Sequence, residues 1–212
     1  MPSTVDLSEW FGEIDIYLFD QLLKGRFRPS MRVLDAGMGG GRNLIYLMRS
    51  GFDVCGVDER AESVASVRRL AAVLAPHLTV TNFRVERVEA MSFADASFDW
   101  VISSAVLHFA EREAHFQKML RDMWRVLKPG GIFFARLASM IGIESLVRPA
   151  GNWRYHLPDG STRFLVDEKM LMSAMQELGG EQLEPIKTVN VQNLRCMTTW
   201  CLRKRPSQTN LS

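Results

Sequence analysis

The chain has 212 residues, of which 47% are hydrophobic and 24% are charged, a composition typical of a globular domain with a buried core. The 26 basic and 24 acidic residues leave a formal net charge of +2, which does not point to nucleic acid as a partner. The cysteines are Cys55, Cys196 and Cys201, and an odd number without clustered spacing argues against a disulfide framework and against a metal site such as zinc.

The sequence also carries expectations about location. Residues 1–10 include acidic side chains and lack the apolar core of a signal peptide. No apolar stretch approaches the roughly 18 residues that a membrane span requires. We therefore expect a cytoplasmic protein with no membrane association, and its unpaired cysteines suit a reducing compartment.

The first half of the chain predicts helices and strands in alternation. A first helix is expected over residues 9–24, because Trp10, Ile14 and Leu18 recur at helical spacing and Gly25 can end it. The elements expected after it are a strand over 31–35, a helix from Arg42 to about Met48, a strand over 52–58, a helix over 62–74 and a strand over 78–85.

The second half continues this alternation before it changes character. The elements expected here are a strand over 98–103, a helix over 111–127, a strand over 132–137, a helix over 167–178 and strands over 183–191 and 194–202. Asp167 is a suitable N-cap for the late helix. The last two strands are joined by so short a connection that they should pair antiparallel.

This alternation predicts an α/β fold: a doubly wound, mostly parallel sheet with helices on both faces. Apolar runs such as residues 132–135 fit strands that are buried on both sides. No repeat or low-complexity segment divides the sequence, and we expect one domain over residues 1–212.

The stretch over residues 138–166 is long for a plain connection and contains several glycines and prolines. It also contains Trp153, Arg154, Tyr155 and His156. We expect this insertion, which follows the fifth strand, to act as an aromatic lid over a neighbouring pocket. A surface cluster that packs on the domain is the alternative.

The loop after the first strand is the best candidate for a binding site. Asp35 ends the strand, and Gly37 and Gly39 to Gly41 follow it. Glycines let the backbone turn sharply and let a ligand approach closely. In open parallel sheets the ligand lies beyond the carboxyl ends of the strands. Asp58 ends the second strand, where a carboxylate can accept hydrogen bonds from both hydroxyls of a ribose.

The stretch from Val33 to Asn43, with the sequence VLDAGMGGGRN, resembles the first motif of class I S-adenosylmethionine-dependent methyltransferases. Residues 93–108 (FADASFDWVISSAVLH) and the turn Leu127–Gly131 (LKPGG) resemble two further family motifs. The Gly-Arg-Asn ending of the first motif is similar to the tellurite-resistance group. The resemblance covers about residues 31–137 and implies a seven-stranded sheet of order 3-2-1-4-5-7-6 with an antiparallel last strand.

The resemblance also implies roles for individual residues toward S-adenosylmethionine, with S-adenosylhomocysteine as the product. Asp35, Gly37, Met38 and Gly39 would hold the methionine end, and Asp58 would bind the ribose. The further cofactor residues implied are Asn43, Glu59, Arg60, Arg87, Val88, Glu89, Ser103 and Ser104. Arg42 would pair with the cofactor carboxylate; a solvated residue of the first helical turn is the alternative.

Two positions depart from the family pattern. Met38 stands where the family has cysteine or another small residue, but only its backbone is needed. Arg87 stands where an aspartate often accepts a hydrogen bond from the adenine amino group, and a guanidinium has no acceptor. Either Glu86 or Glu89 substitutes, or backbone and packing hold the adenine.

Two side chains are catalytic candidates. His108 follows the fourth strand and is the best candidate for a general base; a partly buried histidine that only packs is the alternative. Tyr17 on the first helix would close over the cofactor, or else belongs to the packed face of that helix.

The function we expect from the sequence is methyl transfer to a small-molecule substrate by a monomer or homodimer. The alternatives are a methyltransferase that acts on protein or RNA, and a protein that binds the cofactor without catalysis. A nicotinamide-dependent oxidoreductase is a third alternative, which the Asp-x-Gly-x-Gly loop and the terminal strand pair oppose.

Overall fold

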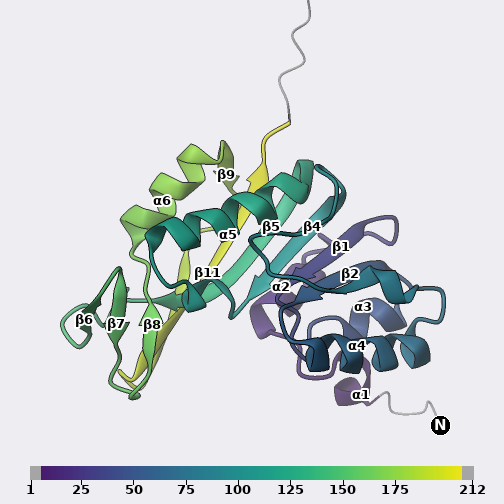
Figure 1. The fold of residues 1–212 in the computed structure, drawn as a ribbon, viewed down its shortest axis with the longest axis horizontal. Helices are drawn as coiled ribbons and strands as arrows, with labels where there is room; N and C mark the ends of the chain where they lie inside the picture. Colours follow the sequence, from purple (N-terminus) through teal and green to yellow (C-terminus); the bar gives the residue numbers. More distant parts are fainter. Residues whose placement is uncertain (1–5, 207–212) are drawn as a thin grey trace, which may run out of the picture.

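A computed structural model describes residues 6–206 of the chain (Figure 1). Its helices are α1 (Leu7–Phe11), α2 (Ile16–Leu23), α3 (Ile45–Arg49), α4 (Ala61–Leu74), α5 (Glu113–Val126) and α6 (Glu168–Glu177), with 3-10 turns η1 (Val80–Asn82) and η2 (Leu107–Phe109). Its strands are β1 (Arg32–Ala36), β2 (Asp53–Asp58), β3 (Phe83–Val85), β4 (Phe98–Ser104), β5 (Leu127–Ser139), β6 (Arg148–Gly151), β7 (Arg154–His156), β8 (Thr162–Phe164), β9 (Gly180–Gln182), β10 (Lys187–Val191) and β11 (Arg195–Lys204).

The main sheet has the strand order β10-β11-β5-β4-β1-β2-β3, with β9 paired to the end of β11. Strands β1 to β5 run parallel, and β11 lies antiparallel between β5 and β10. This order confirms the predicted sequence of strands 3-2-1-4-5-7-6, with β9 as an additional short strand. The predicted antiparallel pairing of the last two strands is confirmed as well.

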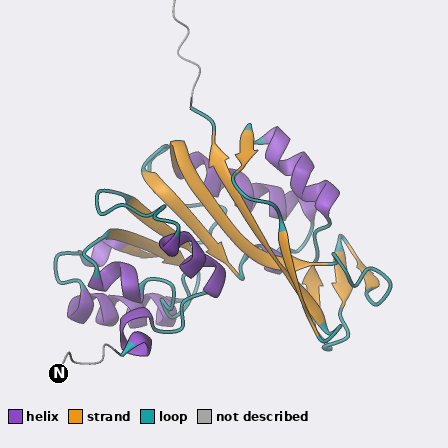
Figure 2. Cartoon of the chain, turned by 180° about the vertical axis from the view of Figure 1, so that it is seen from behind, coloured by secondary structure: helices purple, strands orange, loops and turns teal. Residues whose placement is uncertain are grey.

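Helices cover both faces of this sheet (Figures 1 and 2). Helices α5 and α6 bury Phe116, Met123 and Leu171 against one face, in a cluster with strand residues such as Phe133. Helices α2, α3 and α4 pack on the other face, where Leu18 belongs to a second cluster. Side chains that alternate along a strand point to opposite faces, so each central strand contributes to both clusters.

The predicted helix over residues 9–24 is wrong in one respect, because it is broken into α1 and α2. Gly12 has a φ of +58°, and a Cβ at this position would lie 2.5 Å from Cδ1 of Ile45. The chain therefore turns where it packs against α3. Asp15 then begins α2 by accepting a hydrogen bond from the backbone N–H of Tyr17 at 3.0 Å.

Two other boundaries differ from expectation. The helix expected from Arg42 begins only at Ile45, after a turn in which the N–H of Leu44 donates to the carbonyl of Gly41. The strand expected over 78–85 is limited to β3, because Val80–Asn82 forms a 3-10 turn. Both differences arise where local turn hydrogen bonds replace the regular pattern.

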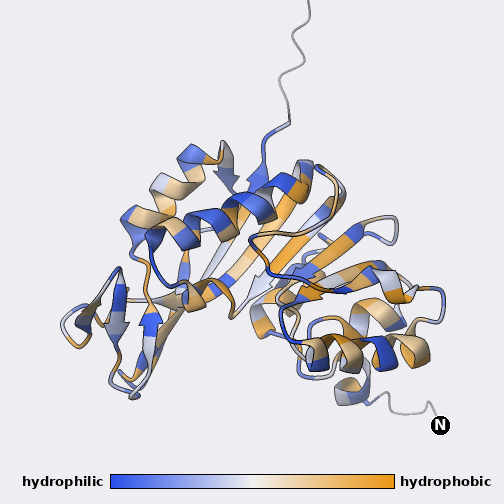
Figure 3. Ribbon diagram, viewed as in Figure 1, coloured by the Kyte–Doolittle hydropathy of each residue, from blue (hydrophilic) through white to orange (hydrophobic). Residues whose placement is uncertain are grey.

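The insertion forms a small sheet of its own, in the order β6-β7-β8. Figure 3 shows that it is more hydrophilic than the central strands β4 and β5. It is tied to the main sheet at Val166, which bridges to Ser139 at the end of β5. None of the helices over residues 6–206 has the length and apolar character needed to cross a membrane.

Candidate active site

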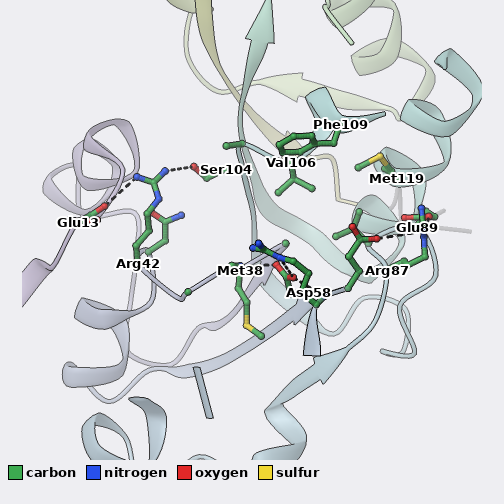
Figure 4. Close-up of a pocket in the computed structure, with 18 of the residues that line it drawn as sticks. Glu13, Met38, Arg42, Asp58, Arg87, Glu89, Ser104, Val106, Phe109 and Met119 are labelled. Atoms are coloured by element: carbon green, nitrogen blue, oxygen red, sulfur yellow. Dashed lines mark hydrogen bonds and ion pairs between the residues drawn. The ribbon is translucent and has the colours of Figure 1, made fainter. Parts of the chain in front are cut away.

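A cavity of about 1000 Å³ lies where β1, β2 and β4 end (Figure 4). Most of the predicted cofactor residues line it: Gly37, Met38, Gly39, Arg42, Asn43, Asp58, Glu59, Arg60, Arg87, Val88, Glu89 and Ser104. The parallel strands bring these residues together, because their carboxyl ends meet at one edge of the sheet.

The glycine-rich loop is held against β2 by its backbone. The N–H groups of Gly37 and Met38 both donate to the carbonyl of Val57, at 2.9 and 3.0 Å. Gly37 has a φ of +83°, and a Cβ there would lie 2.4 Å from Cγ2 of Val106. Glycine is therefore required by both the backbone conformation and the close approach of Val106.

Met38 lines the cavity, but its side chain belongs to the buried core. A Cβ on Gly56 would lie 2.2 Å from the sulfur of Met38, so the thioether lies directly over this strand residue. The methionine that departs from the family pattern thus fills the space above Gly56, and Figure 4 shows its sulfur directed away from the cavity.

Asp58 is 7% exposed and fixes the far side of the loop. Its Oδ2 accepts from the N–H of Gly39 at 2.9 Å, and its Oδ1 accepts from the N–H of Arg60 at 3.0 Å. Oδ1 also accepts from Nε of Arg60 at 3.4 Å, and because a carboxylate has capacity for about four hydrogen bonds, about one acceptor site remains for a ligand hydroxyl.

Asp35 lies at the end of β1 and is 1% exposed. Within the described residues, no group donates a hydrogen bond to either of its carboxylate oxygens. Burial raises the pKa of this carboxyl to about 7, against the opposing effect of Arg42. A buried carboxyl without a partner is costly, and a cationic ligand nearby would remove that cost.

Arg42 and Asn43 connect the loop to the N-terminal segment. Arg42 donates to the carbonyl of Glu13 at 3.3 Å and to the hydroxyl of Ser104 at 3.2 Å (Figure 4). The amide oxygen of Asn43 accepts from the N–H of Asp15 at 3.0 Å. Through these contacts, the segment between α1 and α2 closes one end of the cavity.

The other end of the cavity is bordered by charged side chains. Arg87 pairs with Glu89 and lies 3.5 Å from Glu59. Burial acts to raise the pKa of Glu89, but the hydrogen bonds that it accepts and the charges of Arg87 and His115 together outweigh burial, and the pKa lies below its ordinary value. Glu86 does not line the cavity, because it accepts from the backbone and hydroxyl of Ser92.

A hydrophobic wall faces these polar groups, and sequence reasoning missed it. Figure 4 shows Val106, Phe109 and Met119 across the cavity from Asp58. Val106 lies inside the motif over residues 93–108, so its place in that motif was a usable signal. Met119 becomes adjacent only because α5 packs beside η2. The other lining residues missed are Gly12, Glu13, Gly40, Ile45, Ala105, Glu111 and His115.

Four predicted site residues do not line this cavity, and Asp35, described above, is one of them. Ser103 is fully buried, because it and Ser104 alternate along β4 and only one can face the cavity. Tyr17 is half-buried, with its ring 4.7 Å from the guanidinium of Arg136. His108 lines a neighbouring cavity instead.

The predicted lid differs from its expected form. Trp153, Tyr155 and His156 line neither cavity. Leu157 and Arg163 from the same insertion do line the neighbouring cavity. The insertion therefore forms a wall there, and its aromatic side chains lie elsewhere on the small sheet.

Comparison with known proteins identifies relatives over this region. A family model described as a methyltransferase domain matches residues 34–135. An uncharacterised methyltransferase of Synechocystis sp. is 32% identical over 61% of this chain and 53% of the relative. The malonyl-[acyl-carrier protein] O-methyltransferase of Enterobacter lignolyticus is 30% identical over 73% of this chain and 56% of the relative. The chain thus spans about half the length of these relatives.

A solved structure shares the fold. The 1,6-didemethyltoxoflavin-N1-methyltransferase of Burkholderia thailandensis, with bound 1,6-didemethyltoxoflavin and S-adenosylhomocysteine, superposes with a TM-score of 0.69. It is 19% identical, over 92% of this chain and 80% of that chain.

Proposed function

The chain belongs to the class I S-adenosylmethionine-dependent methyltransferases, and on that premise we propose that it transfers a methyl group from S-adenosylmethionine to a small-molecule acceptor. The observation that carries this proposal is the cavity of about 1000 Å³ built from the glycine-rich loop, Asp58 and the end of β4. S-adenosylmethionine, when bound, supplies a methyl group on a positively charged sulfonium.

The residues present fit this cofactor. Asp35 offers a buried carboxylate without a hydrogen-bond partner among the described residues, which suits the cationic methionine end. Asp58 retains acceptor capacity for a ribose hydroxyl. Glu89, which lines the cavity where Glu86 does not, is the carboxylate available to the adenine amino group. Arg42 is placed to pair with the methionine carboxylate.

The chain's own contribution is to position the reactants and exclude water. A sulfonium is already a good leaving group, so holding the acceptor in line with the methyl supplies most of the advantage. The pocket for that acceptor is the neighbouring cavity, which shares Arg42 and Ala105 with the first. Its volume of about 460 Å³ suits a small molecule.

The alternatives make different predictions about the acceptor and the cofactor. A methyltransferase acting on protein or RNA needs a surface for a macromolecule beside the methyl group, whereas a neighbouring cavity of about 460 Å³ supports the small acceptor. A nicotinamide-dependent enzyme would bind NAD instead. A non-catalytic binding protein would bind S-adenosylmethionine and turn over no acceptor.

The test of cofactor binding is a calorimetric titration of the protein with S-adenosylmethionine, S-adenosylhomocysteine and NAD in parallel. Asp58→Ala should weaken binding of both methionine cofactors about tenfold or more, since hydrogen bonds to an ionised group are lost. Asp53→Ala is the matched control, because Asp53 begins the same strand and is exposed. Binding of NAD alone would overturn the proposal, and an unchanged affinity in Asp58→Ala would remove Asp58 from the ribose site.

A further inference from the structure

The second cavity is adjacent to the first, and Arg42 and Ala105 line both. Its walls come from the N-terminal segment, η2, β5, β11 and the insertion. The residues that line it are Ile14, Asp15, Ile16, Arg42, Ala105, His108, Arg136, Ala138, Leu157, Asp159, Ser161, Arg163, Arg195 and Met197. The lining of this cavity thus combines charged and polar side chains with apolar ones.

Positive charge dominates this cavity, because arginines outnumber its carboxylates. Both carboxylates are already paired. Asp15 lies 3.7 Å from Arg42 and 3.5 Å from Arg136, whereas Asp159 lies 3.8 Å from Arg195. The cavity therefore carries excess positive charge that an anionic ligand would neutralise.

Arg163 is the arginine best placed to meet that ligand. Among residues 6–206 it has no carboxylate within ion-pair distance, and its Nη1 donates only to the backbone carbonyl of Thr162, at 3.0 Å. Its guanidinium lies 5.1 Å from the ring centre of Phe109, which orients it. The half-buried guanidinium of Arg163 therefore retains N–H donors for a planar anion such as a carboxylate.

His108 presents a donor to the same cavity. Its Nδ1 accepts the backbone N–H of Ala138 at 3.2 Å, and a backbone N–H is always the donor. The proton of the neutral ring must therefore be on Nε2. In this tautomer His108 has no free lone pair with which to take a proton from an acceptor. The sequence-based hypothesis of a general base is thus replaced by a hydrogen-bond donor.

The cavity consequently lacks an available base. Asp15 and Asp159 are engaged by arginines, and the accepting nitrogen of His108 is occupied. An acceptor that must lose a proton during methyl transfer would find no partner among these groups. An acceptor that is already an anion needs none.

We propose that the second cavity binds a small carboxylate-bearing acceptor through Arg163 and the Nε2–H of His108, and that this carboxylate receives the methyl group. The inference rests on the proposed function. A carboxylate oxygen donates a lone pair to the methyl carbon as the carbon–sulfur bond breaks, and that bond's electron pair remains on sulfur. A neutral methyl ester and neutral thioether form, and no proton moves.

Binding is tested on the protein saturated with S-adenosylhomocysteine. The probes are a panel of aliphatic and aromatic carboxylates of up to about ten carbons, the matching amides, and inorganic phosphate. Carboxylates should bind about tenfold or more tightly than their amides, because an amide cannot form the charged contact. Tighter binding of phosphate than of every carboxylate, or equal binding of amides, would overturn the proposal.

The contact residues are tested in the same assay. Arg163→Gln should lower carboxylate affinity about tenfold or more while leaving S-adenosylhomocysteine affinity within about twofold. Arg148→Gln is the matched control, because Arg148 lies on the same small sheet, is exposed and lines neither cavity. Equal carboxylate affinity in both variants would refute the assignment of Arg163.

The transferred group is tested by turnover of each bound carboxylate with labelled methyl donor. A methyl ester releases labelled methanol in mild alkali, whereas methyl groups on nitrogen, sulfur or an ether do not. Alkali-stable product would sink the proposal while leaving the methyltransferase function intact. Absence of S-adenosylhomocysteine binding would instead refute the proposed function itself.

Discussion

At the scale of single residues, burial and one hydrogen bond decide what His108 can do. Burial, followed by the positive charge of Arg163, lowers the pKa of His108 to about 4. The ring is therefore neutral across physiological pH, with its tautomer fixed by Ala138. Its chemistry is determined by a neighbour thirty residues away in the chain.

The state of His108 is testable by nitrogen NMR of imidazole-labelled protein. The Nδ1 and Nε2 resonances should show a single tautomer, protonated at Nε2, without titration between pH 8 and about pH 5. His108→Gln identifies the signals by their disappearance. A midpoint near 6.5, or a proton on Nδ1, would contradict this description.

Residue roles were predicted unevenly from the sequence, for physical reasons. The residues from Gly37 to Asp58 that we expect to bind the cofactor follow strands, and the carboxyl ends of parallel strands meet at one edge of the sheet, so these residues line one cavity. Ser103 and Ser104 could not both face the cavity, because alternation places their side chains on opposite faces of β4. No sequence pattern indicated that Arg163 lines the second cavity, because its position depends on how the insertion folds.

At the scale of elements, the glycine-rich loop is constrained at some positions and free at others. Gly37 combines a φ of +83° with a close approach to Val106. A Cβ on Gly40 would meet nothing within 4 Å, and Gly40 is not among the glycines of positive φ. The same motif therefore contains one glycine that packing requires and another that it does not.

This contrast predicts different stabilities for two alanine variants. Gly37→Ala should lower the free energy of unfolding by about 2 kcal/mol or more, from left-handed backbone strain and the clash with Val106. Gly40→Ala should change it by less than about 1 kcal/mol. Denaturant unfolding measures both. Equal losses would mean that Val106 moves aside freely.

Element boundaries were predictable where hydrophobic periodicity was strong. Strands β2 and β4 and helices α4 and α5 lie within a few residues of their expected ranges. The break between α1 and α2 was missed because Gly12 packs against Ile45, a contact that local periodicity does not encode. The small β6-β8 sheet was missed because its strands are short and largely exposed.

At the scale of the whole molecule, Asp35 links folding stability to pH. Its pKa is raised to about 7 in the folded protein, whereas an unfolded aspartate titrates near 3.8. The folded state therefore binds the extra proton between these values, and this group's contribution to stability falls as pH rises from about 4 to about 7. His108 acts in the opposite direction, because its folded pKa is lowered.

Replacing Asp35 separates its effect on stability from that of His108. Asp35→Asn should be more stable than the unaltered protein at pH 8 by an amount on the order of a few kcal/mol, and by much less at pH 4. Thermal or denaturant unfolding across this range measures the difference. A difference independent of pH would show that Asp35 is ionised in the folded state throughout.

The carboxylate of Asp15 attaches the N-terminal segment to the body of the protein. It is 5% exposed and is contacted from the glycine-rich loop, from β4 and from β5. The segment that precedes it, α1, has no buried residue. Elements with little buried surface undergo local unfolding most readily. The segment from α1 to Asp15 is therefore expected to unfold locally more readily than the sheet, and the ion pairs of Asp15 are among the contacts that oppose this unfolding.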